Sequence, residues 1–126
     1  MKFSQSFEIT KWDQAAYDEA GTIQLGRAGV GKTFTGGELE GTSTAELLMA
    51  GTADGPAAYT ALERFTGTLG GRKGSFVMLH GATADQNGAP GTIVAAEGDL
   101  AGLTGTVLYE HTEDGAPRIT VDYELP

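Results

Sequence analysis

The chain has 126 residues, enough for one domain with a buried core, and it contains 20 glycines, no cysteine and a formal net charge of −9. An acidic surface repels phosphate backbones, so we expect no nucleic-acid partner. The absence of cysteine excludes disulfides, thiolate metal sites and cysteine nucleophiles, and it fits a reducing cytoplasm. With no apolar run of the ~18 residues that a membrane span needs and no signal-peptide pattern, we expect a cytoplasmic protein without a membrane partner.

The N-terminal segment predicts a strand followed by an ambiguous stretch. Apolar and polar residues alternate from Phe3 to Ile9, which predicts a half-buried first strand with Gln5 on its inner face. Residues 11–20, KWDQAAYDEA, are the one segment that could form a short helix. They could equally form an extended loop that carries two aromatic residues over one mouth of a barrel.

The next segment contains a phosphate-loop pattern. Ile23 and Leu25 predict a second strand, with Arg27 on the same face. Residues 26–33, GRAGVGKT, match the pattern G-x-x-x-x-G-K-[ST], but that motif requires a following helix. The residues that follow, FTGGELEGTST, are poor helix formers, so we expect two strands that meet at a glycine-rich turn. Further strands are predicted at 33–37 and 40–50.

Residues 57–82 predict two strands with a glycine-rich turn at 70–73. A four-residue turn would place Glu63 directly opposite His80, and a two-residue turn at Gly70 and Gly71 would make them diagonal neighbours on one face. A three-residue turn would separate them. The inner face of this pair is expected to carry Tyr59, Ala61, Glu63, Phe65 and Leu69 from the first strand, and Phe76, Met78 and His80 from the second.

The C-terminal part predicts strands at 93–96, 106–111 and 117–125. A two-residue turn near Asp114 would set Glu110 opposite Ile119. We prefer a three-residue turn, because it sets Tyr109 opposite Ile119 and matches the apolar faces. It would also bring His111 towards the inner side at the end of its strand.

These elements predict an all-β fold for residues 1–126. Eight or nine short strands with tight turns, and no repeat or linker, favour a single antiparallel β-barrel of about eight strands. Closing the sheet into a barrel would remove its exposed edges.

Glu63 is the carboxylate most suited to chemistry in this pattern. In an apolar surround its pKa is expected to rise, which would suit general acid or base catalysis near neutral pH. His80 could orient it or relay its proton. The alternative is a structural role in which Arg27 or Arg64 forms an ion pair with Glu63.

Several segments together resemble the bacterial domain-of-unknown-function family 3224. They are KWDQAAYDE, FTGGELEGTS, YTALERFTGTLGGRKGSFVMLHGAT, GDLAGLTGT and ITVDYEL, in order along the chain. The resemblance implies an eight-stranded antiparallel barrel like that of allene oxide cyclase and a cytoplasmic bacterial protein, and it implies no activity. Where the family has Gly-Ser-Gly-Thr-Gly, this chain has VAAEG at 94–98, which is stiffer and adds Glu97.

We therefore predict a barrel that binds an apolar small molecule, with a cofactor-independent cyclase or isomerase as the candidate enzyme class. The alternatives are a non-catalytic carrier and a packed interaction protein that forms a homo-oligomer, a dimer or trimer, because Val77 and Leu79 make the outer face apolar too. No metal site or cofactor is expected. The predicted site consists of Glu63 and His80 as catalytic residues and of Arg27, Tyr59, Phe65 and Met78 as ligand-binding residues.

Overall fold

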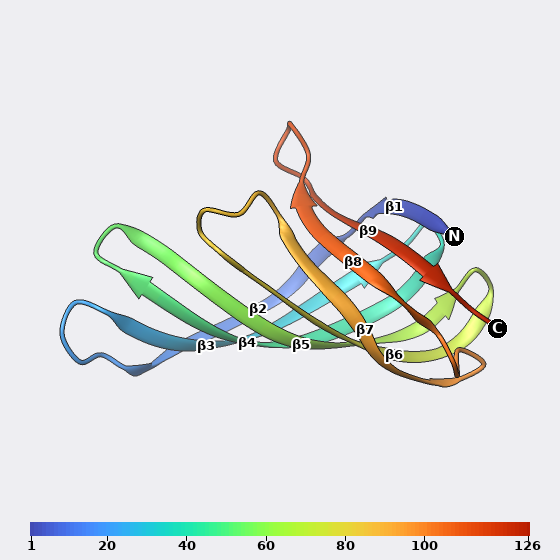
Figure 1. Ribbon diagram of the computed structural model, residues 1–126, viewed down its shortest axis with the longest axis horizontal. Helices are drawn as coiled ribbons and strands as arrows, with labels where there is room; N and C mark the ends of the chain where they lie inside the picture. The colour runs from blue at the N-terminus through green and yellow to red at the C-terminus, as the bar shows by residue number, and fades with distance from the viewer.

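The computed structural model describes residues 1–126 and contains nine strands in one antiparallel sheet (Figure 1). From β2 to β9 each strand pairs with the next along the chain, and β1 pairs with β9. The prediction of an all-β, antiparallel, barrel-like fold is confirmed. The strands are β1 (Lys2–Ser6), β2 (Glu8–Asp18), β3 (Gln24–Phe34), β4 (Leu39–Thr52), β5 (Gly55–Leu69), β6 (Arg72–Thr83), β7 (Ala89–Gly98), β8 (Thr104–His111) and β9 (Pro117–Glu124). The structure contains no helix that is long and apolar enough to cross a membrane.

The sheet curls into a half-barrel whose two edge strands are joined through Phe7 but do not pair with one another. These edges are β1 and β2, which follow one another in the chain, and Phe7 alone separates them. The side chain of Gln5 bridges the seam on the β1 side. Its Nε2 donates to the carbonyl oxygen of Leu39 at 2.8 Å and to that of Thr35 at 3.3 Å, and its Oε1 accepts from the Leu39 amide at 3.0 Å. A side chain thus supplies hydrogen bonds where the backbone ladder stops.

Replacing Gln5 with alanine should lower the free energy of unfolding by about 1–3 kcal/mol, because the buried backbone groups of Leu39 lose their partners. Hydrogen exchange at the Leu39 amide should accelerate by more than global destabilisation explains. The matched control is Gln24→Ala, since Gln24 is exposed. Equal effects of the two substitutions, measured by urea unfolding, would show that the Gln5 side chain does not hold the seam.

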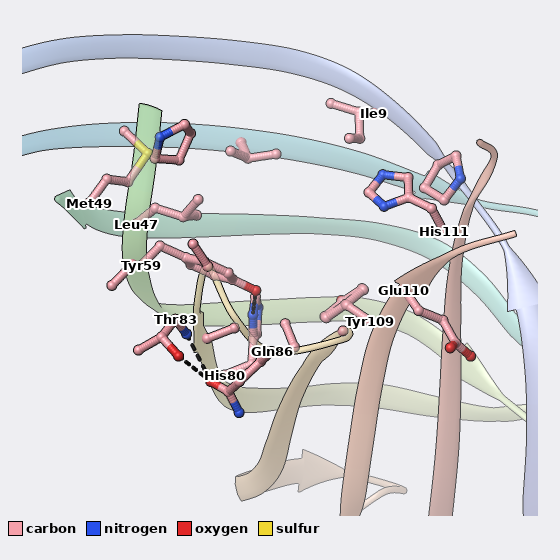
Figure 2. A pocket seen from close by; sticks show the side chains of 18 of the residues that line it. Ile9, Leu47, Met49, Tyr59, His80, Thr83, Gln86, Tyr109, Glu110 and His111 are labelled. Carbon is pink, nitrogen blue, oxygen red and sulfur yellow. Dashed lines mark hydrogen bonds between the residues drawn. The ribbon is translucent and has the colours of Figure 1, made fainter. Parts of the chain in front are cut away.

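Small residues line one end of the sheet's interior. The buried residues there are Ala28 and Val30 from β3, Ala45 and Leu47 from β4, and Ala61 from β5. Of these residues, Val30 and Leu47 line a cavity that is open to solvent at this end of the curled sheet (Figure 2).

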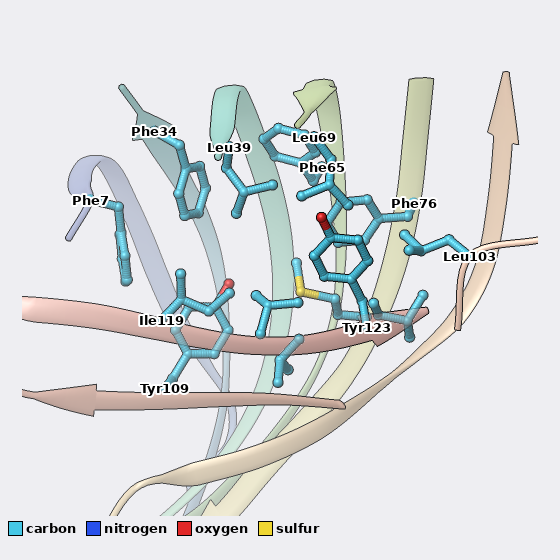
Figure 3. Packing of buried hydrophobic residues seen from close by; sticks show 14 of the residues in the cluster. Phe7, Phe34, Leu39, Phe65, Leu69, Phe76, Leu103, Tyr109, Ile119 and Tyr123 are labelled. Atoms are coloured by element: carbon cyan, nitrogen blue, oxygen red, sulfur yellow. The ribbon is translucent and has the colours of Figure 1, made fainter. Parts of the chain in front are cut away.

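Large residues fill the other end (Figure 3). Four aromatic rings lie in a row across it, with centroid separations of 5.1 Å for Phe7–Phe34, 5.6 Å for Phe34–Phe65 and 5.1 Å for Phe65–Phe76. Leu39, Leu69, Leu100, Ile119 and Val121 are almost completely buried around them. The barrel is therefore solid at one end and hollow at the other.

In the N-terminal third, one open alternative is resolved and one prediction is wrong. Residues 11–18 belong to the exposed strand β2, so this segment is extended and not helical, although it is a strand and not a loop. The GRAGVGKT segment contains neither a phosphate loop nor a turn, because residues 24–34 form the continuous strand β3. Its even-numbered residues from Ala28 to Phe34 are buried and the intervening glycines face outward, which is strand periodicity. Glycine content alone suggested a turn that the chain does not make.

The hairpin turns resolve the alternatives left open by the sequence. Between β5 and β6 the turn has two residues, Gly70 and Gly71, both with positive φ (58° and 85°). The four-residue alternative is wrong, and Ala61, not Glu63, lies opposite His80. At the last hairpin Tyr109 pairs with Ile119, as the three-residue turn predicted.

The outer face of the sheet carries exposed aliphatic side chains. Leu62 pairs with Leu79 across β5 and β6, and both are exposed, as are Leu48 on β4 and Val94 on β7. His111 lies on the inner side at the end of β8, as the three-residue turn predicted, where it is exposed and lines the rim of the cavity.

Candidate functional site

The hollow end of the sheet encloses a cavity of about 650 Å³ (Figure 2). Most of its lining is hydrophobic, including Val30, Leu47 and Met49. Exposed residues of β2 form one wall, and the β6–β7 connection forms part of the rim. The polar groups at the inner end of the cavity come from Lys32, Tyr59, His80 and Tyr109.

Glu63 lies behind this cavity and is completely buried. Its Oε1 accepts hydrogen bonds from Lys32 Nζ at 2.9 Å and from His80 Nε2 at 2.8 Å, and its Oε2 accepts from Ser43 Oγ at 2.5 Å. The three donors come from β3, β6 and β4; β4 and β6 flank β5, and β3 lies beyond β4. Lys32 and Ser43 are direct cross-strand partners, so the register itself places both beside the carboxylate.

These contacts keep Glu63 ionised. Burial alone would raise its pKa, but the hydrogen bond from His80, the charge of Lys32 and the hydrogen bond from Ser43 together lower the pKa to about 2. The expectation of a raised pKa is therefore wrong, because three hydrogen-bond donors contact the Glu63 carboxylate directly and the apolar residues lie beyond them. Burial lowers the pKa of Lys32, and the carboxylate of Glu63 opposes that shift.

His80 connects the buried carboxylate to the cavity. Its Nε2 faces Glu63, and its Nδ1 lies 2.9 Å from the Tyr59 hydroxyl (Figure 2). A carboxylate can only accept, so Nε2 carries the hydrogen in the bond to Glu63. In a neutral imidazole Nδ1 is then an acceptor, and Tyr59 donates to it. Burial, and then the charge of Glu63, raise the pKa of Tyr59 to about 12, so its hydroxyl keeps its proton at neutral pH.

Tyr109 adds a second phenol to the same cluster. The ammonium of Lys32 lies 3.9 Å from the centre of its ring, which is a close cation–π contact. Its hydroxyl is buried and has no hydrogen-bond partner. Burial and the nearby charge of Glu63 raise the pKa of Tyr109 well above its usual value. An unpartnered buried donor is costly in a folded protein and is typical of functional sites.

The structure brings together some predicted site residues and separates others. Glu63 and His80 are in contact, and Tyr59 lines the cavity beside them. Phe65 and Met78 are fully buried in the solid end of the core and do not line the cavity. They share the inner face of their strands with Glu63 and His80, but they point to the filled end.

The proposed arginine partners of Glu63 are on the outer face. Arg27 forms an exposed ion pair with Glu46 at 3.2 Å, and Arg64 pairs with Glu97 at 2.9 Å. Arg27 is the odd-numbered neighbour of the inward residues Ala28 and Val30, so strand alternation points it outward. The prediction that Arg27 binds a ligand inside the barrel is therefore wrong in its geometry.

Sequence reasoning missed Lys32, Ser43 and Tyr109 as members of this cluster. For Lys32 a signal was present, because it falls on the same parity as Ala28, Val30 and Phe34. Reading residues 24–34 as one alternating strand would have placed a lysine on an apolar inner face, where a carboxylate partner is needed.

The fold and cluster define a class of all-β, barrel-like domains with a buried ion pair behind an open cavity. The chain belongs to a family described as "Protein of unknown function (DUF3224)", whose model matches residues 3–123. It is similar to the crystal structure of a protein of unknown function from the DUF3224 family of Shewanella oneidensis MR-1, with 32% sequence identity and a TM-score of 0.81. That match covers 100% of this chain and 98% of the other. No curated protein matches the sequence. The family resemblance seen in the sequence motifs is confirmed.

Proposed function

We propose that this protein binds an apolar small molecule in the cavity at the hollow end of the sheet. The observation that carries the proposal is a cavity of about 650 Å³ with a mainly hydrophobic lining and a few convergent polar groups. Ligand sites in proteins have this composition and a typical volume of roughly 300–1,000 Å³. Val30 and Leu47 belong to its apolar lining, and Tyr59 and His80 offer polar contacts to a ligand.

Filling the cavity should abolish binding. Ala82 is an inward-facing residue of β6 that lines the cavity and lies opposite Tyr59, so Ala82→Phe would place a ring in the ligand space. The affinity for the neutral dye Nile red, measured by fluorescence titration, should fall by about tenfold or more. The matched control is Thr60→Phe, which adds a ring to the exposed face of β5. Equal affinities of the two variants and the wild type would place dye binding outside the cavity.

A second candidate function is cofactor-independent isomerisation or cyclisation, and the chain of hydrogen bonds Glu63–His80–Tyr59 favours it. The roles differ from those expected from the sequence. Glu63 does not line the cavity and stays ionised, so it orients His80 and stabilises an imidazolium. His80 and Tyr59 are the groups that could accept and return a proton of a bound molecule.

A further inference from the structure

The positions of the hydrogen atoms in the cluster determine which polar group of a ligand can form a hydrogen bond in the cavity. The Glu63 carboxylate accepts hydrogen bonds from Lys32, Ser43 and His80. The neutral imidazole of His80 in turn accepts a hydrogen bond from the Tyr59 hydroxyl at Nδ1. With its only hydrogen directed at His80, the Tyr59 oxygen offers the cavity lone pairs alone. At this point the site is a hydrogen-bond acceptor, and a ligand must donate to it.

The charges in the cluster favour negative charge on that same ligand group. The charges of Glu63 and Lys32 cancel one another before any proton transfer, but of these two residues only Lys32 lines the cavity. The acidic residue in the lining, Glu110, is paired with Arg118 at 2.7 Å. Tyr109 also lines the cavity, but its hydroxyl is buried and is not exposed to a ligand. A bound molecule therefore meets one lone-pair acceptor, Tyr59, and one cation, Lys32.

We propose, on the basis of the proposed binding function, that the ligand is an apolar molecule with a weakly acidic hydroxyl, a phenol or an enol, which the site binds as its anion. A neutral ketone or ether has no proton to donate to Tyr59. A carboxylate is already ionised at neutral pH and would set its own lone pairs against those of Tyr59. A phenol or enol supplies the proton first and the negative charge afterwards.

The proton transfer balances without a cofactor. The ligand O–H bond breaks and its proton forms a new bond to the Tyr59 oxygen, while the original Tyr59 proton moves to His80 Nδ1 over the existing 2.9 Å contact. The electron pair stays on the ligand oxygen as an anion. The imidazolium then carries a proton on each ring nitrogen, and its Nε2–H keeps the hydrogen bond to Glu63, 2.8 Å away. The titratable groups that face His80 are Glu63 and Tyr59 from β5 and Tyr109 from β8, whose ring centroid lies 4.7 Å from that of His80.

Three compounds of one shape test the proposal: 4-nitrophenol, its methyl ether 4-nitroanisole, and 4-nitrobenzoate. The titration is made below the solution pKa of 4-nitrophenol, where the free compound is mostly protonated and colourless. The wild-type protein should bind the phenol about tenfold or more tightly than the ether, because a charge-assisted hydrogen bond is lost with the ether. Binding should also develop the yellow absorption band of the phenolate.

The variant Tyr59→Phe should remove both the preference for the phenol and the phenolate band. The matched control is Tyr17→Phe, since Tyr17 is an exposed residue of β2 that does not line the cavity, and it should keep both. Equal binding of phenol and ether, a bound phenol without the phenolate band, or tighter binding of the benzoate would each overturn the acidic-hydroxyl proposal while Nile red binding remains. If Nile red and all three compounds fail to bind, the proposed function falls together with this inference.

Discussion

Replacing Glu63 with glutamine should lower the free energy of unfolding by about 3–5 kcal/mol at neutral pH, because the buried ammonium of Lys32 then lacks its counter-charge. Lys32 is 8% exposed and Glu63 is 0% exposed, so water cannot solvate whichever charge is left without its partner. The variant Lys32→Met should cost a similar amount, since it leaves the carboxylate with hydrogen bonds from His80 and Ser43 but without a cation. Urea unfolding monitored by circular dichroism measures both effects.

The double variant Glu63→Leu/Lys32→Met should be more stable than either single variant, because it leaves no unpaired buried charge. The control is the exposed pair Arg27–Glu46, where Glu46→Gln should change the free energy of unfolding by about 0–1 kcal/mol. If Glu63→Gln costs no more than Glu46→Gln, the buried pair does not contribute to the fold as its geometry indicates.

The sequence predicted the sheet well where alternation and turn length reinforce one another. The pairing of Tyr109 with Ile119 follows from matching two apolar faces across a three-residue turn. For the β5–β6 hairpin the sequence left two turns that keep Glu63 and His80 on one face, and both predict proximity. A register slip of two residues preserves the face, so the contact was predictable although the exact pairing was not.

The candidate site was less predictable because its members come from five different strands. Lys32 and Glu63 are 31 residues apart and meet only because β4 lies between their strands with Ser43 opposite Lys32. Placing Lys32 required recognising β3 as a continuous strand, and its glycines concealed this. The charge state of Glu63 depends on the number of donors around it, and a sequence pattern does not give that number.

The stability of the protein should fall steeply in acid as Glu63 takes up a proton. Its pKa is about 2 in the folded protein and about 4.5 when unperturbed, so the folded state favours the carboxylate. Stability from this group is fully present above about pH 4.5 and is lost as the pH falls towards about 2. The difference of about 2.5 pKa units corresponds to a loss on the order of 3 kcal/mol.

Urea unfolding at a series of pH values across this window measures the effect in the wild type and in Glu63→Leu/Lys32→Met. The acidic surface contributes its own pH dependence to both proteins, so the difference between the two curves isolates the buried pair. Parallel curves would mean that Glu63 titrates in the folded protein as it does when unperturbed, so that its donors do not stabilise the carboxylate. A wild-type curve that falls more steeply in acid than the curve of the variant means that the folded protein keeps Glu63 ionised below its unperturbed pKa, which leaves His80 and Tyr59 as the groups that exchange a proton with a bound molecule.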